Sequence, residues 1–247
     1  MSKKRQRIDV AMLPSYTVRE SHKAKHVSLK VSVAGSLEVV VPQGYDQTAI
    51  PAILQRKQRW IKRVTQQVET RHALIGVEPA DKRPERLCLR AIDQDWRIDY
   101  CPTQMPGIRA IEQGDLELTL FGQTFDQAAC SETLKQWVIG KAQKHLLPWL
   151  QTVSQELELP FETASVRGQK TRWGSCSSRK TISLNCKLLF LPNELVRYVL
   201  IHELCHTVHL NHSAAFWTLV AQCEPQYQEL DAALRDARYH VPLWMEA

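Results

Sequence analysis

The segment YVLIHELCHTVHLNHSAAFW, residues 198–217, decides how the second half of this chain folds. Apolar residues at helical spacing lead into the run HELCH and predict a helix that opens near Asn193 and continues through Leu210. Two residues four apart on a helix differ by about 40° in direction and 6 Å in height. His202 and His206 are therefore expected to present two imidazoles on one face of this helix.

Two imidazoles at this separation suit one zinc ion, which keeps a fourth position open for water when three protein ligands hold it. Glu203 lies one step round the helix, where it can reach a water rather than the metal. That position suits a general base, because zinc lowers the pKa of a water toward about 7. The pattern predicts a metal-dependent hydrolase that uses zinc, although imidazole ligands also accept Mn²⁺ and Co²⁺.

A third protein ligand has three candidates. His212 is favoured because Asn211 is a good helix terminator and Ser213 a good N-cap, so the chain can turn there and bring His212 back to the metal. His209 lies some 10 Å further along a straight helix, which makes it a neighbour of the site rather than a ligand. Glu224, on the following helix, remains an alternative carboxylate ligand.

Hydrophobic periodicity outlines an α+β fold with two parts. Residues 1–125 are expected to form a basic, antiparallel β-rich module with one long helix, and residues 126–247 a domain with a small sheet and the HELCH helix. Strands are predicted at 26–33, 37–41, 87–92, 96–101, 109–113, 116–121, 161–168 and 181–189, and helices at 46–74, 126–157, 193–210, 213–223 and 226–238.

The overall composition is that of a globular protein. Hydrophobic residues make up 44% of the 247 residues and charged residues 23%, and no stretch approaches 18 uncharged apolar residues. The seven cysteines include no CxxC pair, which argues against a disulfide framework and a cysteine zinc knuckle. Cys176, Cys186 and Cys205 are expected to be small buried hydrophobes. We therefore expect a cytoplasmic protein with no membrane partner.

Charge is distributed unevenly along the sequence. Residues 1–90 hold 18 Lys and Arg against 8 Asp and Glu, whereas residues 91–247 hold 14 against 18. The basic excess indicates either a solvated helix face or a surface that attracts a polyanion such as nucleic acid.

The segment RGQKTRWGSC, residues 167–176, adds cations to the acidic second half. Arg167, Lys170 and Arg172 are candidate substrate-binding residues, because a cationic rim suits an anionic substrate. The alternative is structural: Trp173 and Gly174 form a turn that packs on the helix.

These motifs resemble a known family. From Val166 to Trp217, the runs RGQKTRWGSC, ISLNCKLLFLP, YVLIHELCH and NHSAAFW are similar to the YgjP-like metallopeptidase-type domain, a relative of SprT-like and other HExxH zinc hydrolases. The resemblance implies a zincin-like α+β domain with a strand near 182–188 beside the motif helix. It also implies His202, His206 and His212 as metal ligands and Glu203 as the catalytic acid and base.

Three functions remain open at this point. The leading one is a zinc peptidase that pairs an extended peptide with the 181–188 strand and steadies the oxyanion with Arg172 or His209. The second is a nucleoside triphosphate pyrophosphohydrolase that uses the same metal site and neutralises phosphates with Arg167, Lys170 and Arg172. The third is a nucleic-acid adaptor whose metal site is structural, although such a site has no need of an adjacent base.

Overall fold

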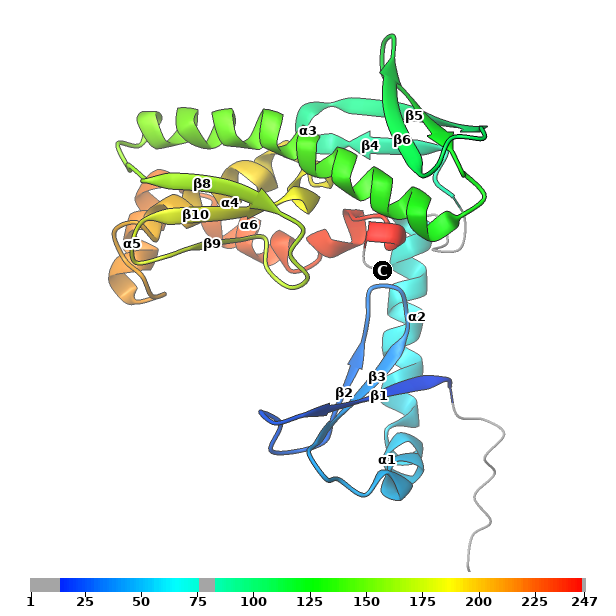
Figure 1. The fold of residues 1–247 in the computed structure, drawn as a ribbon. Coiled ribbons are helices and arrows are strands. Elements are labelled where there is room, and N and C mark those ends of the chain that lie inside the picture. Colours follow the sequence, from blue (N-terminus) through cyan, green and yellow to red (C-terminus); the bar gives the residue numbers. More distant parts are fainter. Residues whose placement is uncertain (1–13, 76–82, 246–247) are drawn as a thin grey trace, which may run out of the picture. The chain divides into compact units, whose positions relative to one another are not determined.

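The computed structural model describes residues 14–75 and 83–245. The chain forms two compact units that divide between residues 77 and 78 (Figure 1). All three sheets contain parallel and antiparallel pairs, so the fold is mixed α/β rather than antiparallel in its first part. Among the described residues, no helix combines the length and apolar character needed to cross a membrane.

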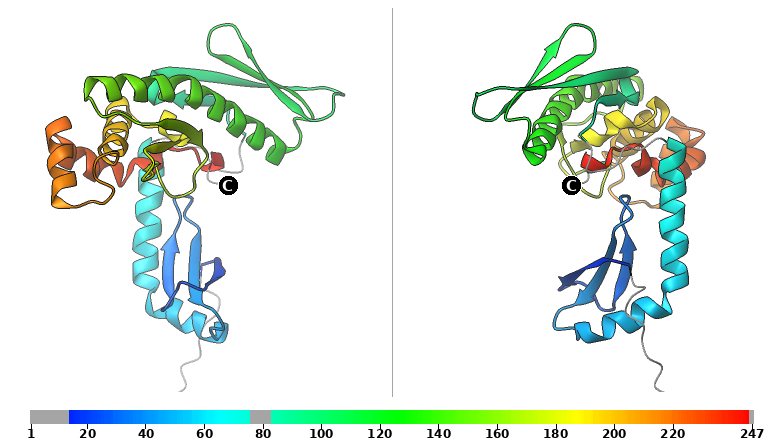
Figure 2. Two further views of the ribbon diagram at one scale, coloured as in Figure 1. Left: turned by 60° about the vertical axis from the view of Figure 1, so that its left-hand side comes forward. Right: turned by 90° about the vertical axis from the view of Figure 1, so that its right-hand side faces the viewer.

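The first unit packs a three-stranded sheet, in the order β1-β3-β2, against two helices. The predicted hairpin is confirmed as β2 and β3, and β1, which the sequence analysis missed, pairs parallel to β3. Asp46 accepts a hydrogen bond from the backbone N–H of Thr48, 3.0 Å away, and starts the helical segment. In both views of Figure 2, α2 runs alongside the hairpin. The elements are β1 (Tyr16–Ser21), β2 (Ser28–Val31), β3 (Leu37–Pro42), α1 (Ile50–Arg56) and α2 (Gln58–Ile75).

The second unit begins with a four-stranded sheet, in the order β4-β5-β7-β6, that packs on the long helix α3. The β5–β7 pair is parallel, which corrects the expectation of antiparallel strands throughout. Leu118 and Leu120 of this sheet share one core with Leu134 and Val138 of α3. For this reason the sheet belongs to the second unit, and the observed division differs from the boundary expected at residues 125 and 126. The elements are β4 (Arg86–Leu89), β5 (Gln94–Pro102), β6 (Ile108–Gln113), β7 (Glu117–Gly122) and α3 (Gln127–Glu156).

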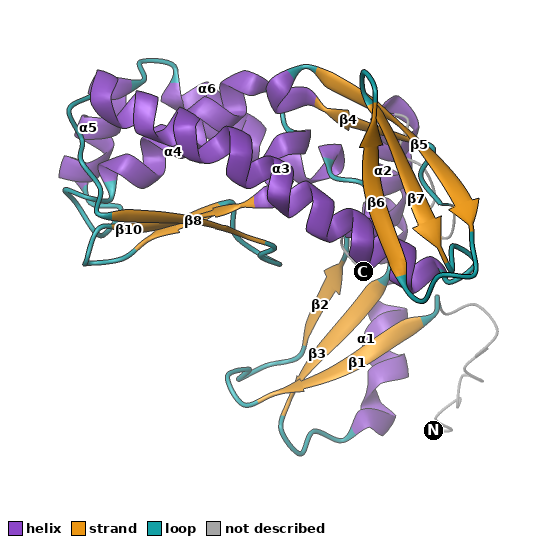
Figure 3. Ribbon diagram, turned by 45° about the horizontal axis from the view of Figure 1, so that its top comes forward, coloured by secondary structure: helices purple, strands orange, loops and turns teal. Residues whose placement is uncertain are grey.

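A second sheet of this unit, in the order β8-β10-β9, lies with the helices to one side of it (Figure 3). The central strand β10 pairs parallel to β8 and antiparallel to β9, so both of its edges are already hydrogen-bonded. The three-residue strand β9 lies at an edge of the sheet and contacts α4. The elements are β8 (Thr163–Arg167), β9 (Gly174–Cys176), β10 (Thr181–Asn185), α4 (Asn193–Cys205), α5 (Ala214–Cys223) and α6 (Tyr227–Leu234).

Several elements are shorter than their sequence patterns predict, β10 and α4 among them, and the single helix predicted at 46–74 is divided at Lys57 into α1 and α2. The strand expected to reach residue 189 ends at Asn185, whose side chain accepts a hydrogen bond from the N–H of Lys187 and starts a 3-10 turn, Cys186–Phe190. The helix expected to reach Leu210 ends at Cys205, because the N–H groups of Thr207 and Val208 bond to carbonyls only three residues back. Tightened turns of this kind are common at helix ends.

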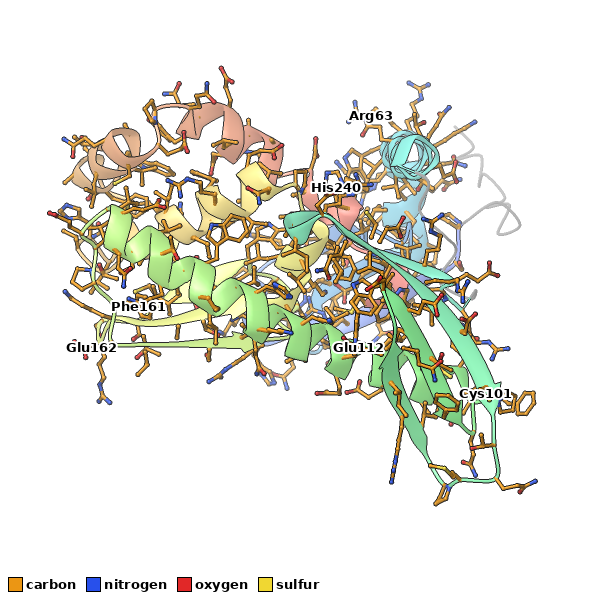
Figure 4. All side chains as sticks on the ribbon, turned by 90° about the horizontal axis from the view of Figure 1, so that it is seen from above. Arg63, Cys101, Glu112, Phe161, Glu162 and His240 are labelled. Carbon is orange, nitrogen blue, oxygen red and sulfur yellow. The ribbon has the colours of Figure 1, made fainter. Side chains whose placement is uncertain are left out.

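A buried lysine joins the four-stranded sheet to α3. Lys141 is 9% exposed in its side chain, and its Nζ lies 2.9 Å from Glu112 Oε2, at the point where sheet and helix meet (Figure 4). The same ammonium lies 4.1 Å from the ring centre of Trp96 and 5.4 Å from that of Trp137. The indole N–H of Trp137 donates to the other oxygen of Glu112, at 2.9 Å. Carboxylate and aromatic rings together compensate the charge of a nearly buried cation.

Removing the two charges of this pair should have unequal effects. Glu112→Ala leaves a buried ammonium without its carboxylate and is expected to lower the free energy of unfolding by about 3 kcal/mol. Lys141→Met keeps the buried volume and leaves only a half-exposed carboxylate, so its loss should be clearly smaller. Urea unfolding followed by far-UV circular dichroism measures both. Equal losses would contradict the proposed role of the carboxylate.

Candidate metal centre

Three histidines meet where α4 gives way to α5. His202 and His206 come from the end of α4 and His212 from the connection before α5, and one ring nitrogen from each lies within 4.8 Å of the other two. The Nε2 atoms of His202 and His212 are 3.0 Å apart. Adjacent ligands of tetrahedral zinc, at Zn–N distances of about 2.05 Å, stand about 3.3 Å apart. The cluster therefore has the dimensions of a three-imidazole metal site.

Phe216 forms the floor of this histidine cluster. Its fully buried ring stacks on His206 at a centroid distance of 4.4 Å and lies 5.0 Å from His202 and 4.9 Å from His212. Ser213 accepts a hydrogen bond from the N–H of Phe216 at 3.4 Å and starts α5 at this point, as its N-cap position predicts. Packing on a single aromatic ring thus restrains all three imidazoles.

His209 contributes its backbone rather than its ring. The Nδ1–H of His206 donates to the carbonyl oxygen of His209 at 2.9 Å, which leaves Nε2 of His206 as the nitrogen with a free lone pair. Hydrogen bonds of this kind orient ligating histidines in metal sites. The early end of α4 makes this bond possible, because a continuing helix would use the same carbonyl within its own ladder.

The surroundings of His202 and His206 favour the neutral imidazole that metal ligation requires. Burial, together with the neighbouring rings of His206 and His212, lowers the pKa of His202 to about 4. Burial also lowers the pKa of His206.

Glu203 lies beside the cluster as a buried carboxyl group. It is 6% exposed, and burial raises its pKa to about 8, which the nearby guanidinium of Arg172 opposes in part. Its Oε2 atom has no hydrogen-bond partner among the described residues. An unpartnered buried oxygen is costly in a protein interior. A cation and its water next to His202 and His206 would satisfy this oxygen, so the site fits a hydrated divalent metal.

The segment 167–176 reaches the site through Gly174. The carboxylate of Glu203 packs directly on the α carbon of Gly174, which agrees with the interpretation that Trp173 and Gly174 pack on the helix. Asn185 holds the connection that leads to this contact, because its Nδ2 donates to the carbonyls of Gln169 and Arg172 at 2.9 and 2.7 Å. The sequence analysis missed Asn185, although an asparagine between a strand and a turn is a recognisable capping signal.

The other candidates differ in position. Arg172 lies near enough to Glu203 to affect its pKa, Lys170 is exposed in the β8–β9 connection, and Arg167 is exposed on β8, on the other side of β10 from Gly174. Glu224 is outside the histidine cluster and accepts a hydrogen bond from the N–H of Gln226 at 3.3 Å.

The cysteines also differ from one another. Cys186 and Cys205 are buried, as expected, whereas Cys176 is only partly buried. Burial and the charge of Glu203 raise the pKa of Cys176 to about 11, so this thiol belongs to the surroundings of the carboxylate.

The raised pKa of Glu203 predicts how the stability of the metal-free protein depends on pH. Between the unfolded value of 4.5 and the folded value of about 8, the folded chain binds more protons at this group, so stability falls as pH rises. Below pH 6.5 the lowered pKa of His202 gives the opposite slope. From pH 6.5 to 8 we therefore expect a loss approaching about 1.4 kcal/mol per pH unit.

Denaturant unfolding with a chelator present, at several pH values in this range, measures the slope. Glu203→Gln should remove most of it and leave the variant more stable than the parent at pH 8. A parent protein whose stability does not change from pH 6.5 to 8 would contradict the prediction.

Comparison with known proteins agrees with the chemistry of the site. A family model described as YgjP-like, metallopeptidase domain, matches residues 25–237. Among solved structures, the metallopeptidase zymogen of Pyrococcus abyssi abylysin is 27% identical, with a TM-score of 0.33, over 35% of this chain and 89% of that chain. No curated protein matches significantly. Membership of a metallopeptidase family implies a divalent metal. Because the family match spans most of the sequence, including the histidine cluster, this chain belongs to the YgjP-like metallopeptidase domain family.

Proposed function

We propose that this protein is a zinc-dependent peptidase in which His202, His206 and His212 hold the metal and Glu203 is the general base. One observation carries the proposal: three imidazoles converge beside a buried carboxylate that has a free oxygen. A purely structural zinc site has no use for such a carboxylate. The zincin-like arrangement of strand and helix expected from the motifs is part of the same proposal.

The reaction follows from the positions of these groups. A divalent metal on three imidazoles supplies Lewis acidity, which makes water nucleophilic near neutral pH. Glu203 takes the proton of the attacking water, holds it in its buried carboxyl group and passes it to the nitrogen of the departing amine. A bound cation would favour the ionised form of this carboxyl group, which is the form that accepts a proton from water.

The substrate peptide pairs with β9 in this proposal. The expected pairing with strand 181–188 is wrong, because β10 is central and has no free edge. The N–H of Asn185 donates to the carbonyl of Trp173, and the N–H of Ser177 donates to the carbonyl of Thr181. In an antiparallel pair, residues whose backbone groups face the partner strand alternate with residues whose groups face away from it. Gly174 and Cys176 therefore direct their N–H and C=O groups to the outer edge, while Glu203 lies on the face of the strand toward which a Cβ of Gly174 would point. An extended peptide added there would bring its backbone to the metal site.

Arg172 is the proposed partner of the developing oxyanion. Its positive charge acts on Glu203, whereas the ring of His209 is outside the histidine cluster. Donors that point at developing charge in a water-poor site contribute strongly to catalysis. Nucleotide hydrolysis is the competing function for Arg172 together with Arg167 and Lys170.

The first experiment measures metal content and product identity together. Protein purified without chelator or added metal is analysed for metal beside His212→Ala and Glu203→Gln. Each protein is then incubated with a library of quenched fluorescent peptides and, separately, with the four nucleoside triphosphates. We expect one zinc per chain in the parent, a loss of zinc in His212→Ala, and new amino termini from peptides. Glu203→Gln should retain zinc and lose at least 100-fold in turnover.

The other outcomes identify which part is wrong. Release of pyrophosphate from nucleotides without peptide cleavage would show that the site belongs to a nucleotide hydrolase rather than a peptidase. Unchanged turnover in Glu203→Gln would show that Glu203 is not the general base. Zinc retained in His212→Ala would show that another residue, Glu224 or His209, is the third ligand.

A further inference from the structure

Gly174 and Glu203 make a contact that any side chain at position 174 would disturb by displacing the carboxylate. A Cβ atom built on Gly174 would lie 2.6 Å from Oε1, 2.7 Å from Cγ and 2.8 Å from Cδ of Glu203. Real Cβ atoms essentially never approach other heavy atoms this closely. The backbone of Gly174 is outside the left-handed region, so its conformation alone does not require glycine. The requirement comes from the carboxylate.

We propose that Gly174 is a positioning residue for the general base, an inference that rests on the role proposed for Glu203. The carboxylate of Glu203 packs against the α carbon of Gly174, which carries no side chain. No described group hydrogen-bonds Oε2 of Glu203, so packing fixes the direction of this oxygen. A methyl group at position 174 would turn the carboxylate away from the histidine cluster, and a displacement of about 1 Å at a reacting group can cost about 100-fold in rate.

The sign of one stability change separates this role from that of an ordinary strand glycine. Glycine within a strand is usually less favourable than alanine, so replacement at a neutral position stabilises the strand. At position 174 the contact with Glu203 should reverse the sign. Cys176, the next residue on the same face of β9, also lies near the carboxylate, which places Glu203 beneath this edge strand.

A double-mutant cycle in metal-free protein tests the contact without any assay of activity. Gly174→Ala should lower the unfolding midpoint in the parent background. In a Glu203→Ala background, where Cγ and the carboxyl group are gone, the same change should have no effect or raise the midpoint. Equal losses in both backgrounds would overturn the proposal.

Kinetics with the zinc-loaded protein test the consequence for catalysis. Gly174→Ala should keep one zinc per chain and the KM of a quenched fluorescent peptide, and lose about 100-fold in kcat. Gly140→Ala is the matched control, because a Cβ there meets nothing within 4 Å, and it should keep the parent kcat. An unchanged kcat in folded Gly174→Ala would overturn the positioning role. Absence of peptide turnover in the parent protein would contradict the proposed function. The double-mutant cycle would still show whether Gly174 and Glu203 interact.

A separate observation concerns the helices of the first unit. Arg56, Lys57, Arg59, Lys62 and Arg63 are all exposed, and no described carboxylate forms an ion pair with them. The inner side of the same helices packs Leu54 and Ile61 into the core of the unit. Of the 19 basic and acidic residues in positions 1–77, 14 are basic. These five cations lie around the junction of the two helices, and we name them the α1–α2 basic face.

We infer that the α1–α2 basic face binds the phosphate backbone of a nucleic acid. Arg59 and Arg63 lie one turn apart, about 6 Å along α2, with Lys62 on the same side. Figure 4 views α2 nearly along its axis and labels Arg63 at its periphery. A helix that binds a lipid surface also exposes large apolar side chains. Among the described residues, all large exposed hydrophobic side chains belong to the second unit, which favours nucleic acid over membrane.

Salt dependence of binding tests this surface independently of the metal site. Fluorescence anisotropy with a labelled 30-nucleotide RNA and a DNA duplex gives Kd between 50 and 200 mM salt. Replacing Arg59, Lys62 and Arg63 together by Ala should reduce the slope of log K against log salt by about 2 to 3. Replacing Lys23, Lys25 and Lys30 removes the same charge elsewhere in the unit and should leave the slope nearly unchanged. Equal reductions in the two variants, or binding only to anionic phosphatidylserine vesicles, would overturn the inference.

Discussion

The burial of α4 on nearly all sides is the constraint on which the second unit depends. Its apolar residues pack on α3, α5, α6 and the edge strand β9, while Asn193, Glu194 and Arg197 of its first turns reach solvent. The side chains of His202, Glu203 and His206 extend from the last turns of this helix. Their positions are therefore set by the core, and His212 needs only the short connection after α4 to join them. A site on rigid elements holds its geometry better than one built on loops.

The same burial creates an electrostatic conflict that the chain alone does not resolve. Neutral histidines suit the interior, but the ionised form of Glu203 does not, and burial raises the pKa of this carboxyl group. A divalent cation would reverse the local preference, because its charge favours the ionised carboxylate. Among the described residues, Arg172 is the cation whose charge acts on Glu203, and a bound metal ion would add to it.

Local signals in the sequence predicted the convergence of three histidines better than they predicted the topology. The caps at Asp46 and Ser213 and the histidine spacing were readable because each depends on residues close in the chain. Parallel pairing of β5 with β7 and the division of the chain near residue 77 were not, because both depend on contacts between distant segments. The Gly174 contact was invisible for the same reason, since no local pattern places a strand glycine against a helical carboxylate.

Sequence separation within the site has a consequence for the order of its assembly. His202 and His212 are ten residues apart, whereas Glu203 is 29 residues from Gly174 and meets it only across the sheet. Closing a short loop costs less chain entropy than closing a long one. On these grounds the nascent chain can gather its metal ligands before the carboxylate is seated against β9. In such a state the metal ligands would be together before the carboxylate has reached its position beside Gly174.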